Sequence, residues 1–424
     1  MNYPHRSHFQ YDRIPGRRRV VVSGIGAVSA AGVGARALWD ALVDGRSCVD
    51  VIETRDGVEI NLGVAAAVKD WDATEHIEAK LRPRRMARVT QFAVVAAAEA
   101  LKDAGFRPED LAGRRVAVIM GSSVSTLGRV EAMVRELDQA GARGVAPNSL
   151  AIQNLQAASL GVAELLDVPT ANVMCLTNNC TSGVDAIGQA AELIRYGRYD
   201  LVVSGGAEAP LSAVISSTLK AAGITTVRSQ AHDASRPFDR ERESGVLGEG
   251  AGVVVLEDAA FAEERGARPY VEICGLHSCA DERRDQPSSG LEITMRGALD
   301  NAAANVRDID YISAWGCGDP LLDRCETEAI KRVFGGDAYR VAVGSIKGVT
   351  GIPLGAAGAL QLVALSLTHR HNILPPTANW QHGDIDCDLD YIGTRARRVR
   401  LRKTLLNAHG MSGGNISLVV AGAT

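Results

Sequence analysis

Residues 178–190 read Asn-Asn-Cys-Thr-Ser-Gly-Val-Asp-Ala-Ile-Gly-Gln-Ala, and this stretch decides how the rest of the chain is interpreted. The apolar segment 171–177 before it predicts a buried strand, and the spacing of apolar residues after it predicts a helix. Cys180 therefore stands where a strand turns into a helix. There its thiol faces free backbone N–H groups and the positive end of the helix, which favour thiolate over thiol. This is the setting of a nucleophile; the alternative is a buried cysteine at the end of a strand.

The composition excludes several classes of protein. The chain has 424 residues, of which 23% are charged, and a formal net charge of −4, so nothing indicates binding to nucleic acid or to an anionic membrane. No apolar run approaches the ~20 residues of a membrane helix. The eight cysteines form no C-x-x-C pair, so we expect no metal site, and a chain of this size needs no disulfide framework. These features predict a protein of the reducing cytoplasm.

The order of the expected elements divides the chain into two halves. Residues 1–18 are polar and basic, and we expect a disordered tail there, with a partner-binding arm as the alternative. Apolar strand and helix patterns alternate over residues 19–261 and again over residues 269–424, with a charged linker at 262–268. Such alternation predicts a layered α/β protein with two mixed sheets, which looks like a duplicated half.

A glycine-rich loop is expected directly after the first strand, which the pattern places at residues 19–23. Gly24, Gly26 and Gly32 follow that strand. Their spacing does not match the G-x-G-x-x-G pattern of dinucleotide-binding proteins, so we reject a dinucleotide site here.

Three further segments carry motifs. Residues 235–257 read Ser-Arg-Pro-Phe-Asp-Arg-Glu-Arg-Glu-Ser-Gly-Val-Leu-Gly-Glu-Gly-Ala-Gly-Val-Val-Val-Leu-Glu, residues 344–358 read Gly-Ser-Ile-Lys-Gly-Val-Thr-Gly-Ile-Pro-Leu-Gly-Ala-Ala-Gly, and residues 407–415 read Asn-Ala-His-Gly-Met-Ser-Gly-Gly-Asn. Together with the segment around Cys180, they resemble in order and composition the β-ketoacyl-acyl-carrier-protein synthases, the condensing enzymes of fatty acid and type II polyketide synthesis. The resemblance runs from about residue 19 to the C-terminus.

This resemblance implies a thiolase fold, with αβαβα layers in each half, and a tight dimer. It implies that Cys180 carries an acyl group as a thioester and that the backbone N–H groups of Cys180 and Met411 form the oxyanion hole. Lys347 matches the family lysine, and Glu326 matches the acid that pairs near it; a buried salt bridge is the alternative role for both. No cofactor is implied except the phosphopantetheine arm of an acyl carrier protein.

Two histidines that stand beside the cysteine in the family are absent. The family segment His-Gly-Thr-x-x-Pro is Trp-Gly-Cys-Gly-Asp-Pro at 315–320, and Lys-x-x-x-Gly-His ends here in Ile352. Trp315 keeps one N–H donor and Ile352 keeps none, so neither can transfer a proton. Malonyl decarboxylation should therefore slow by several orders of magnitude, whereas acyl loading needs mainly a thiolate and an oxyanion hole.

One departure from the family pattern is a candidate compensation. His409 stands where the family usually has the first phenylalanine of Asn-Ser-Phe-Gly-Phe-Gly-Gly, close to the nucleophile. The hypothesis is a relocated base, or a hydrogen bond to the acyl carbonyl; the alternative is a loop histidine bonded to backbone. Trp315, Ile352 and Asn179 are expected at the substrate pocket, although Asn179 could equally only hold the turn. Cys317 is either a second thiol or a buried small residue.

Two functions fit these observations. The first is an atypical acyltransferase that loads an acyl group from carrier protein or coenzyme A onto Cys180 and transfers or condenses it in fatty acid or polyketide-type biosynthesis. The second is a non-condensing partner subunit of a ketosynthase heterodimer, similar to a chain-length factor, in which Trp315 plugs the pocket. The retained cysteine counts against the second. The sequence leaves open a homodimer or a heterodimer.

Overall fold

The computed structural model describes most of the chain. The described ranges are 18–55, 58–111, 113–226, 230–281, 287–411 and 413–423. The basic tail expected at residues 1–18 lies outside them, apart from Arg18, whose guanidinium forms ion pairs with Asp200 and Asp258. Within these ranges, no helix has both the length and the apolar character of a membrane span.

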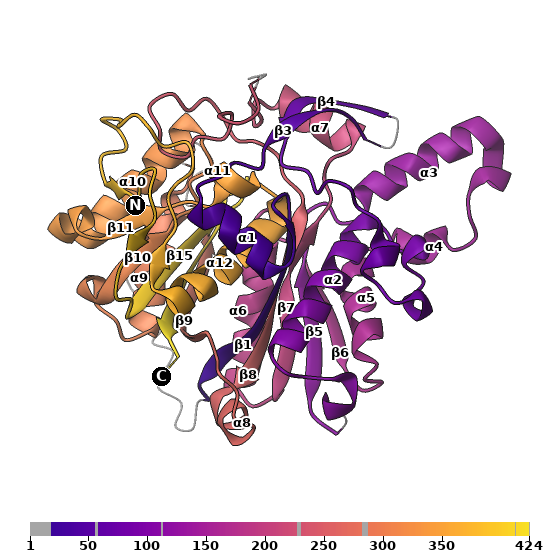
Figure 1. The fold of residues 1–424 in the computed structure, drawn as a ribbon, viewed down its shortest axis with the longest axis horizontal. Helices are drawn as coiled ribbons and strands as arrows, with labels where there is room; N and C mark the ends of the chain where they lie inside the picture. The colour runs from indigo at the N-terminus through magenta and orange to yellow at the C-terminus, as the bar shows by residue number, and fades with distance from the viewer. Residues whose placement is uncertain are drawn as a thin grey trace, which may run out of the picture.

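One sheet of twelve strands runs through the molecule (Figure 1). Its first half has the order β1 (Val20–Ser29), β8 (Gly250–Asp258), β7 (Leu201–Glu208), β5 (Val116–Gly121) and β6 (Asn172–Leu176). Its second half has the order β9 (Val271–Ala280), β16 (Gly414–Gly422), β15 (Lys403–His409), β10 (Ile309–Ser313), β11 (Ala342–Gly344) and β13 (Asp390–Tyr391). Both halves are mixed, because parallel strands lie beside antiparallel ones.

The expectation of two separate mixed sheets needs one correction. The antiparallel strands β1 and β9 pair directly through Val21 with Glu272 and Val22 with Val271, so the two halves share one continuous ladder. The linker expected at 262–268 falls on the end of α8 (Ala259–Glu264) and the turn that follows it.

Helices form a central layer and two outer layers. The central layer is α6 (Ser182–Arg195) with α12 (Ala357–His371), and residues 357–369 of α12 are all buried. Helices α2 (Arg88–Asp103) and α5 (Ala157–Leu166) cover the first half of the sheet, and α9 (Ser289–Asn301) and α10 (Pro320–Phe334) cover the second half. This order of layers gives the α/β fold class that the sequence predicts. The twelfth strand of the sheet, β2 (Gly32–Val33), pairs with β1. The remaining α-helices and strands are α1 (Ala35–Val43), β3 (Asp50–Arg55), β4 (Val58–Ala65), α3 (Leu127–Ala140), α4 (Ser149–Ile152), α7 (Ala213–Ala221), α11 (Lys347–Thr350), β12 (Ile373–Leu374) and β14 (Arg397–Arg398).

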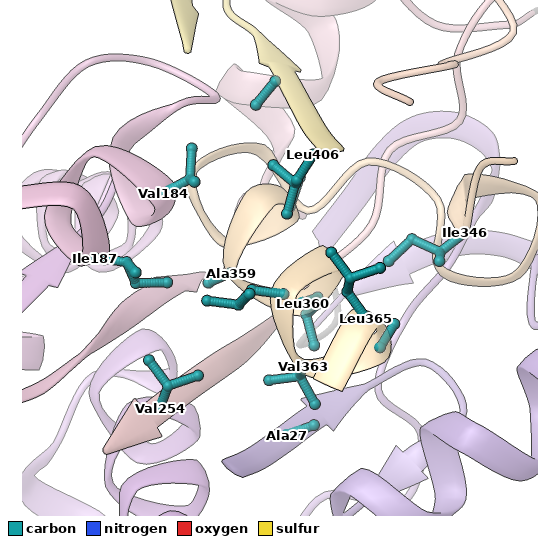
Figure 2. Packing of buried hydrophobic residues seen from close by; sticks show 14 of the residues in the cluster. Ala27, Val184, Ile187, Val254, Ile346, Ala359, Leu360, Val363, Leu365 and Leu406 are labelled. Atoms are coloured by element: carbon teal, nitrogen blue, oxygen red, sulfur yellow. The ribbon is translucent and has the colours of Figure 1, made fainter. Parts of the chain in front are cut away.

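The central layer packs against both halves of the sheet. Figure 2 shows Ile187 of α6 and Leu360 of α12 in one cluster with Val254 and Ala27 of the first half and Leu406 of the second half. The two halves therefore share a hydrophobic core.

Gly24 and Gly26 lie inside β1 and not in the loop expected after it. A Cβ atom added at Gly24 would lie 2.1 Å from the carbonyl oxygen of Ala100, and one at Gly26 would lie 2.0 Å from that of Ala96. These glycines let α2 pack directly on the strand backbone, a packing role that a loop assignment missed.

The segment from α3 to β6 is poorly covered by the rest of the chain. Helix α3 projects from the body (Figure 1) and has no buried residue. Several large apolar side chains are exposed along this segment: Leu127, Val134, Leu137, Leu150, Leu155 and Leu160. Strand β6 is the edge strand of the sheet, and none of its residues is fully buried.

Candidate active site

The turn between β6 and α6 holds Cys180 two residues before the helix begins. Asn179 adopts a positive φ of 49°, which asparagine tolerates better than most residues. The backbone N–H of Asn178 donates to Ser182 Oγ at 2.8 Å, and Thr181 Oγ1 donates to the Asn178 carbonyl at 2.8 Å. The asparagines and hydroxyls before the helix thus stabilise the turn that carries the thiol.

A cavity of about 90 Å³ borders Cys180. Its wall includes Trp315, Ile352, His409 and Met411, which the sequence analysis placed near the nucleophile, and also Cys317. The rest of the wall is mainly aliphatic, with Leu219, Ile224, Val246, Leu247, Leu322 and Leu354. An engineered cavity of about 150 Å³ is known to hold benzene, so this one has room for a short group of atoms.

Asn179, expected at the pocket, does not line this cavity. Its side chain lies beside the backbone of Gly410, where an added Cβ would be 3.4 Å from the Asn179 Cβ. The left-handed conformation directs the Asn179 side chain away from the cavity, so the role of this residue is to form the turn before α6.

The thiol of Cys180 is fully buried, and this burial raises its pKa to about 12. The backbone N–H groups of Met411 and of Cys180 point at the sulfur and lower the pKa, but burial outweighs them. The expectation that the helix start favours thiolate is therefore wrong. The structure does bring together the two N–H groups expected to form an oxyanion hole.

Lys347 and Glu326 are both buried, but no ion pair joins them among the described residues. Glu326 accepts hydrogen bonds from the backbone N–H groups of Trp315 and Gly316 at 2.9 Å each. Lys347 Nζ donates to Gln361 Oε1 at 3.0 Å and lies 4.1 Å from the centre of a Trp315 ring. Burial lowers the pKa of Lys347 to about 8, although the nearby carboxyl of Glu326 opposes the shift. The direct pairing expected from the sequence is thus corrected: the carboxyl binds backbone donors instead.

Lys347 does not line the cavity, whereas Trp315 contacts both the cavity and the lysine. The tryptophan ring therefore forms the part of the cavity wall that lies nearest the buried amine of Lys347. We expect Lys347 to act on the cavity only through Trp315 and the neighbouring backbone.

His409 ends strand β15 and is buried, with 4% of its surface exposed. Its Nδ1 atom lies 2.9 Å from Oδ1 of Asn415, and its ring lines the cavity. The alternative of a loop histidine bonded to backbone is therefore wrong, because the partner is a side chain and the residue lies in a strand.

The chain matches the family descriptions "Beta-ketoacyl synthase, N-terminal domain" over residues 17–262 and "Beta-ketoacyl synthase, C-terminal domain" over residues 271–381. The chain belongs to the β-ketoacyl synthase family.

Relatives of this chain include a polyketide synthase subunit and an acyl-carrier-protein synthase. It is 37% identical to the tetracenomycin polyketide synthase ketoacyl synthase alpha subunit of Streptomyces glaucescens, over 95% of this chain and 97% of the relative. It is 34% identical to 3-oxoacyl-[acyl-carrier-protein] synthase 2 of Coxiella burnetii, over 96% and 99%.

Solved structures show that this family member has the thiolase fold. The ishigamide ketosynthase/chain length factor superposes with a TM-score of 0.88 at 30% identity, covering 96% of this chain and 100% of that one. A ketosynthase in the AntDE:AntF complex, described as a type II acyl-carrier protein with its ketosynthase bound to the hexaketide, gives 0.87 at 30% identity with the same coverage.

Gln361, which the sequence motifs did not indicate, supplies the hydrogen-bond partner of Lys347. Its Nε2 atom also donates to the carbonyl oxygens of Ala314 and Asn407, at 3.0 and 3.2 Å. The available signal was a large amide side chain within the otherwise apolar run 357–365 of α12.

Alkylation of Cys180 by iodoacetamide is expected to accelerate about tenfold per pH unit from pH 6.5 to 9.5, without a plateau. The reason is that a pKa of about 12 keeps the thiolate a minor species over this range. Its fraction rises tenfold with each unit of increasing pH as long as the pH stays below the pKa. Peptide mass spectrometry after timed quenching measures the rate. A plateau near pH 8 would show a thiol with an ordinary or lowered pKa.

Proposed function

We propose that this β-ketoacyl synthase family member is an acyltransferase that loads an acyl group from an acyl carrier protein or coenzyme A onto Cys180 and then transfers or condenses it. The observation that carries the proposal is a thiol at a cavity with two backbone N–H groups directed at it. The residues at positions 315 and 352 leave that thiol without the imidazoles of ordinary condensation.

Loading is a thioester exchange that these groups support. The sulfur of Cys180 attacks the donor carbonyl, and the carbonyl oxygen accepts hydrogen bonds from the N–H groups of Cys180 and Met411. The carbon–sulfur bond of the donor then breaks, and the donor sulfur leaves with the proton that Cys180 releases. Each N–H donor of such a hole typically accelerates the reaction by about 10²–10³. Because burial raises the pKa of this thiol to about 12, the attacking thiolate is a minor species of the protein.

The acyl group would arrive on the phosphopantetheine arm of an acyl carrier protein, and the chain itself would hold no metal or organic cofactor. The AntDE:AntF structure, a ketosynthase with its carrier protein, supports this partner. All eight cysteines are free, which suits the cytoplasm as the place of reaction. The exposed apolar residues from α3 to β6 would be covered by a second copy or by a ketosynthase-family subunit.

A second candidate is a non-condensing partner subunit similar to a chain-length factor. The observation that favours it is that neither Trp315 nor Ile352, both in the cavity wall, can transfer a proton. The ishigamide ketosynthase/chain length factor shows the same fold. The cavity beside Cys180 favours the acyltransferase.

Intact-mass measurement tests the proposal. We expect an acyl adduct after incubation with acetyl-coenzyme A or with a carrier protein bearing an acetyl or butyryl group. Cys180→Ala should abolish the adduct, whereas Cys317→Ala, which alters another thiol of the same cavity, should retain it. A mass that stays unshifted with every donor, together with co-purification of an active ketosynthase, would support the partner-subunit function instead.

A further inference from the structure

The imidazole of His409 is bound on one side only. Its Nδ1 atom contacts Asn415 Oδ1 at 2.9 Å, and its Nε2 atom has no hydrogen-bond partner within the described part of the chain. The ring lines the cavity beside Cys180, but no hydrogen bond joins the two side chains in the described structure. One ring nitrogen is thus anchored while the other is free for a molecule in the cavity.

The hydrogen bonds of Asn415 decide which nitrogen of His409 carries the proton. The Asn415 Nδ2 group donates to Asp281 Oδ1 at 2.8 Å and to the Gly413 carbonyl at 3.0 Å. Both amide hydrogens therefore have acceptors, and Asn415 Oδ1 remains as an acceptor. His409 Nδ1 must be the donor to it, so in the neutral ring Nε2 keeps its lone pair.

Asp281, which directly follows β9, is held by backbone N–H groups at the start of α9. Its Oδ1 atom accepts from the Gly290 N–H at 2.9 Å, and its Oδ2 atom accepts from the Ser288 N–H at 3.1 Å. A Cβ added at Gly290 would lie 2.5 Å from Asn415 Nδ2, so this contact requires glycine. A carboxylate, an amide and an imidazole thus form a rigid chain that ends in the cavity.

We infer that His409 is the general base of the acyl-transfer step, that Asn415 and Asp281 are its positioning residues, and that the acceptor is a small alcohol. This inference rests on the proposed acylation of Cys180. An imidazole oriented by an amide oxygen recurs in enzymes of unrelated fold that use a cysteine nucleophile. The absence of a bond between His409 and the thiol assigns the base to the acceptor and not to Cys180.

The chemistry of the cavity selects the acceptor. Its wall is mainly aliphatic, so an ammonium group would lose most of its hydration on entering. Among the described residues, the only carboxyl in the wall is that of Asp319, whose Oδ1 already accepts from the N–H groups of Leu321 and Leu322. A hydroxyl group enters uncharged and needs a base before it can attack.

The transfer step balances. Nε2 of His409 takes the hydroxyl proton while the alcohol oxygen bonds to the carbonyl carbon of the acyl group on Cys180. The carbonyl oxygen is held by the N–H groups of Cys180 and Met411. When the carbon–sulfur bond breaks, the sulfur leaves as the thiolate. Because no hydrogen bond joins it to His409 in the described structure, the sulfur takes up a proton from solvent while Nε2 returns its proton to solvent. The products are an ester and the free thiol, with no oxidant or metal required.

A single-turnover experiment separates transfer from loading. Wild-type protein is acetylated on Cys180 with acetyl-coenzyme A and freed of donor, and the decay of the adduct is followed by intact mass with ethanol, ethylamine or no acceptor. We expect ethanol to accelerate decay and to yield ethyl acetate. His409→Ala and His409→Gln should load as the wild type does but transfer about 10²-fold or more slowly. Added imidazole should partly rescue His409→Ala.

Further variants test the positioning residues. Asn415→Ala should slow transfer and leave loading intact, whereas His371→Ala, an exposed histidine at the end of α12, should change neither rate. Unchanged transfer in both His409 variants would overturn the inference alone. Faster decay with ethylamine than with ethanol would overturn the alcohol acceptor, and failure of the wild type to load would overturn the proposed function and this inference with it.

Discussion

Malonyl groups offered on a carrier protein are expected to keep their carboxylate, with decarboxylation about 10⁴-fold or more slower than in a family member that has both histidines. The resemblance to the family implies that Trp315 and Ile352 stand where those histidines would stabilise the enolate, and loss of one such donor typically costs about 10²–10³ in rate. Both residues line the cavity beside Cys180, and the ammonium group of Lys347 lies behind Trp315. Conversion of malonyl- to acetyl-carrier protein, followed by mass spectrometry, measures the rate.

Variants that return the imidazoles test the cause of this loss. Trp315→His/Ile352→His should decarboxylate faster than the wild type, and each single variant should fall between the two. Decarboxylation by the wild-type protein at the rate of its histidine-containing relatives would contradict the prediction. It would mean that another group, with His409 the nearest candidate, stabilises the enolate.

Replacing Glu208 by leucine is expected to prevent accumulation of folded protein. The carboxyl of this buried residue at the end of β7 accepts five hydrogen bonds, from Ser122 Oγ and from the N–H groups of Ser123, Val124, Ser125 and Gly355. A buried donor left unsatisfied costs about 1–3 kcal/mol, so five together reach about 5 kcal/mol or more. That is comparable with the entire stability of many proteins, about 5–15 kcal/mol.

Urea unfolding and the yield of soluble protein measure this effect. Glu208→Gln keeps one oxygen acceptor and should be destabilised less than Glu208→Leu. As a matched control, Glu292→Leu removes a partly exposed acid that pairs with Arg296 and Arg332, and should shift the midpoint only slightly. A Glu208→Leu protein with a midpoint close to the wild type would show that water or rearranged backbone satisfies these donors.

Much of the fold could be predicted because its cues are local. Alternating apolar patterns indicated layered α/β halves, and the strand before Cys180 and the helix after it are present as β6 and α6. The pairing of β1 with β9 could not be predicted, because it joins segments about 250 residues apart through only two residue pairs. The glycines of β1 were misassigned for a similar reason, since the contact that requires them comes from α2.

The candidate site divides in the same way. Motif order brought Cys180, Trp315, Ile352, His409 and Met411 together, and all five line one cavity. Burial of the thiol depends on the whole surrounding core, so the direction of its pKa shift could not be inferred from the local turn.

The partner of a buried charge was equally hidden. The hydrogen-bond partner of Lys347 is Gln361, a polar side chain that α12 places beside it. The sequence motif alone indicated Glu326 as that partner.

The shared central layer of α6 and α12 has a consequence for making and recombining such proteins. Helix α12 is buried along nearly its whole length and meets strands of both halves. If the chain were divided near residue 265 into two separate fragments, each fragment would expose a large hydrophobic surface to water. We expect each fragment to aggregate when it is expressed alone. Chimeras within the family should therefore tolerate crossover points in surface loops, provided that both halves are present in one chain.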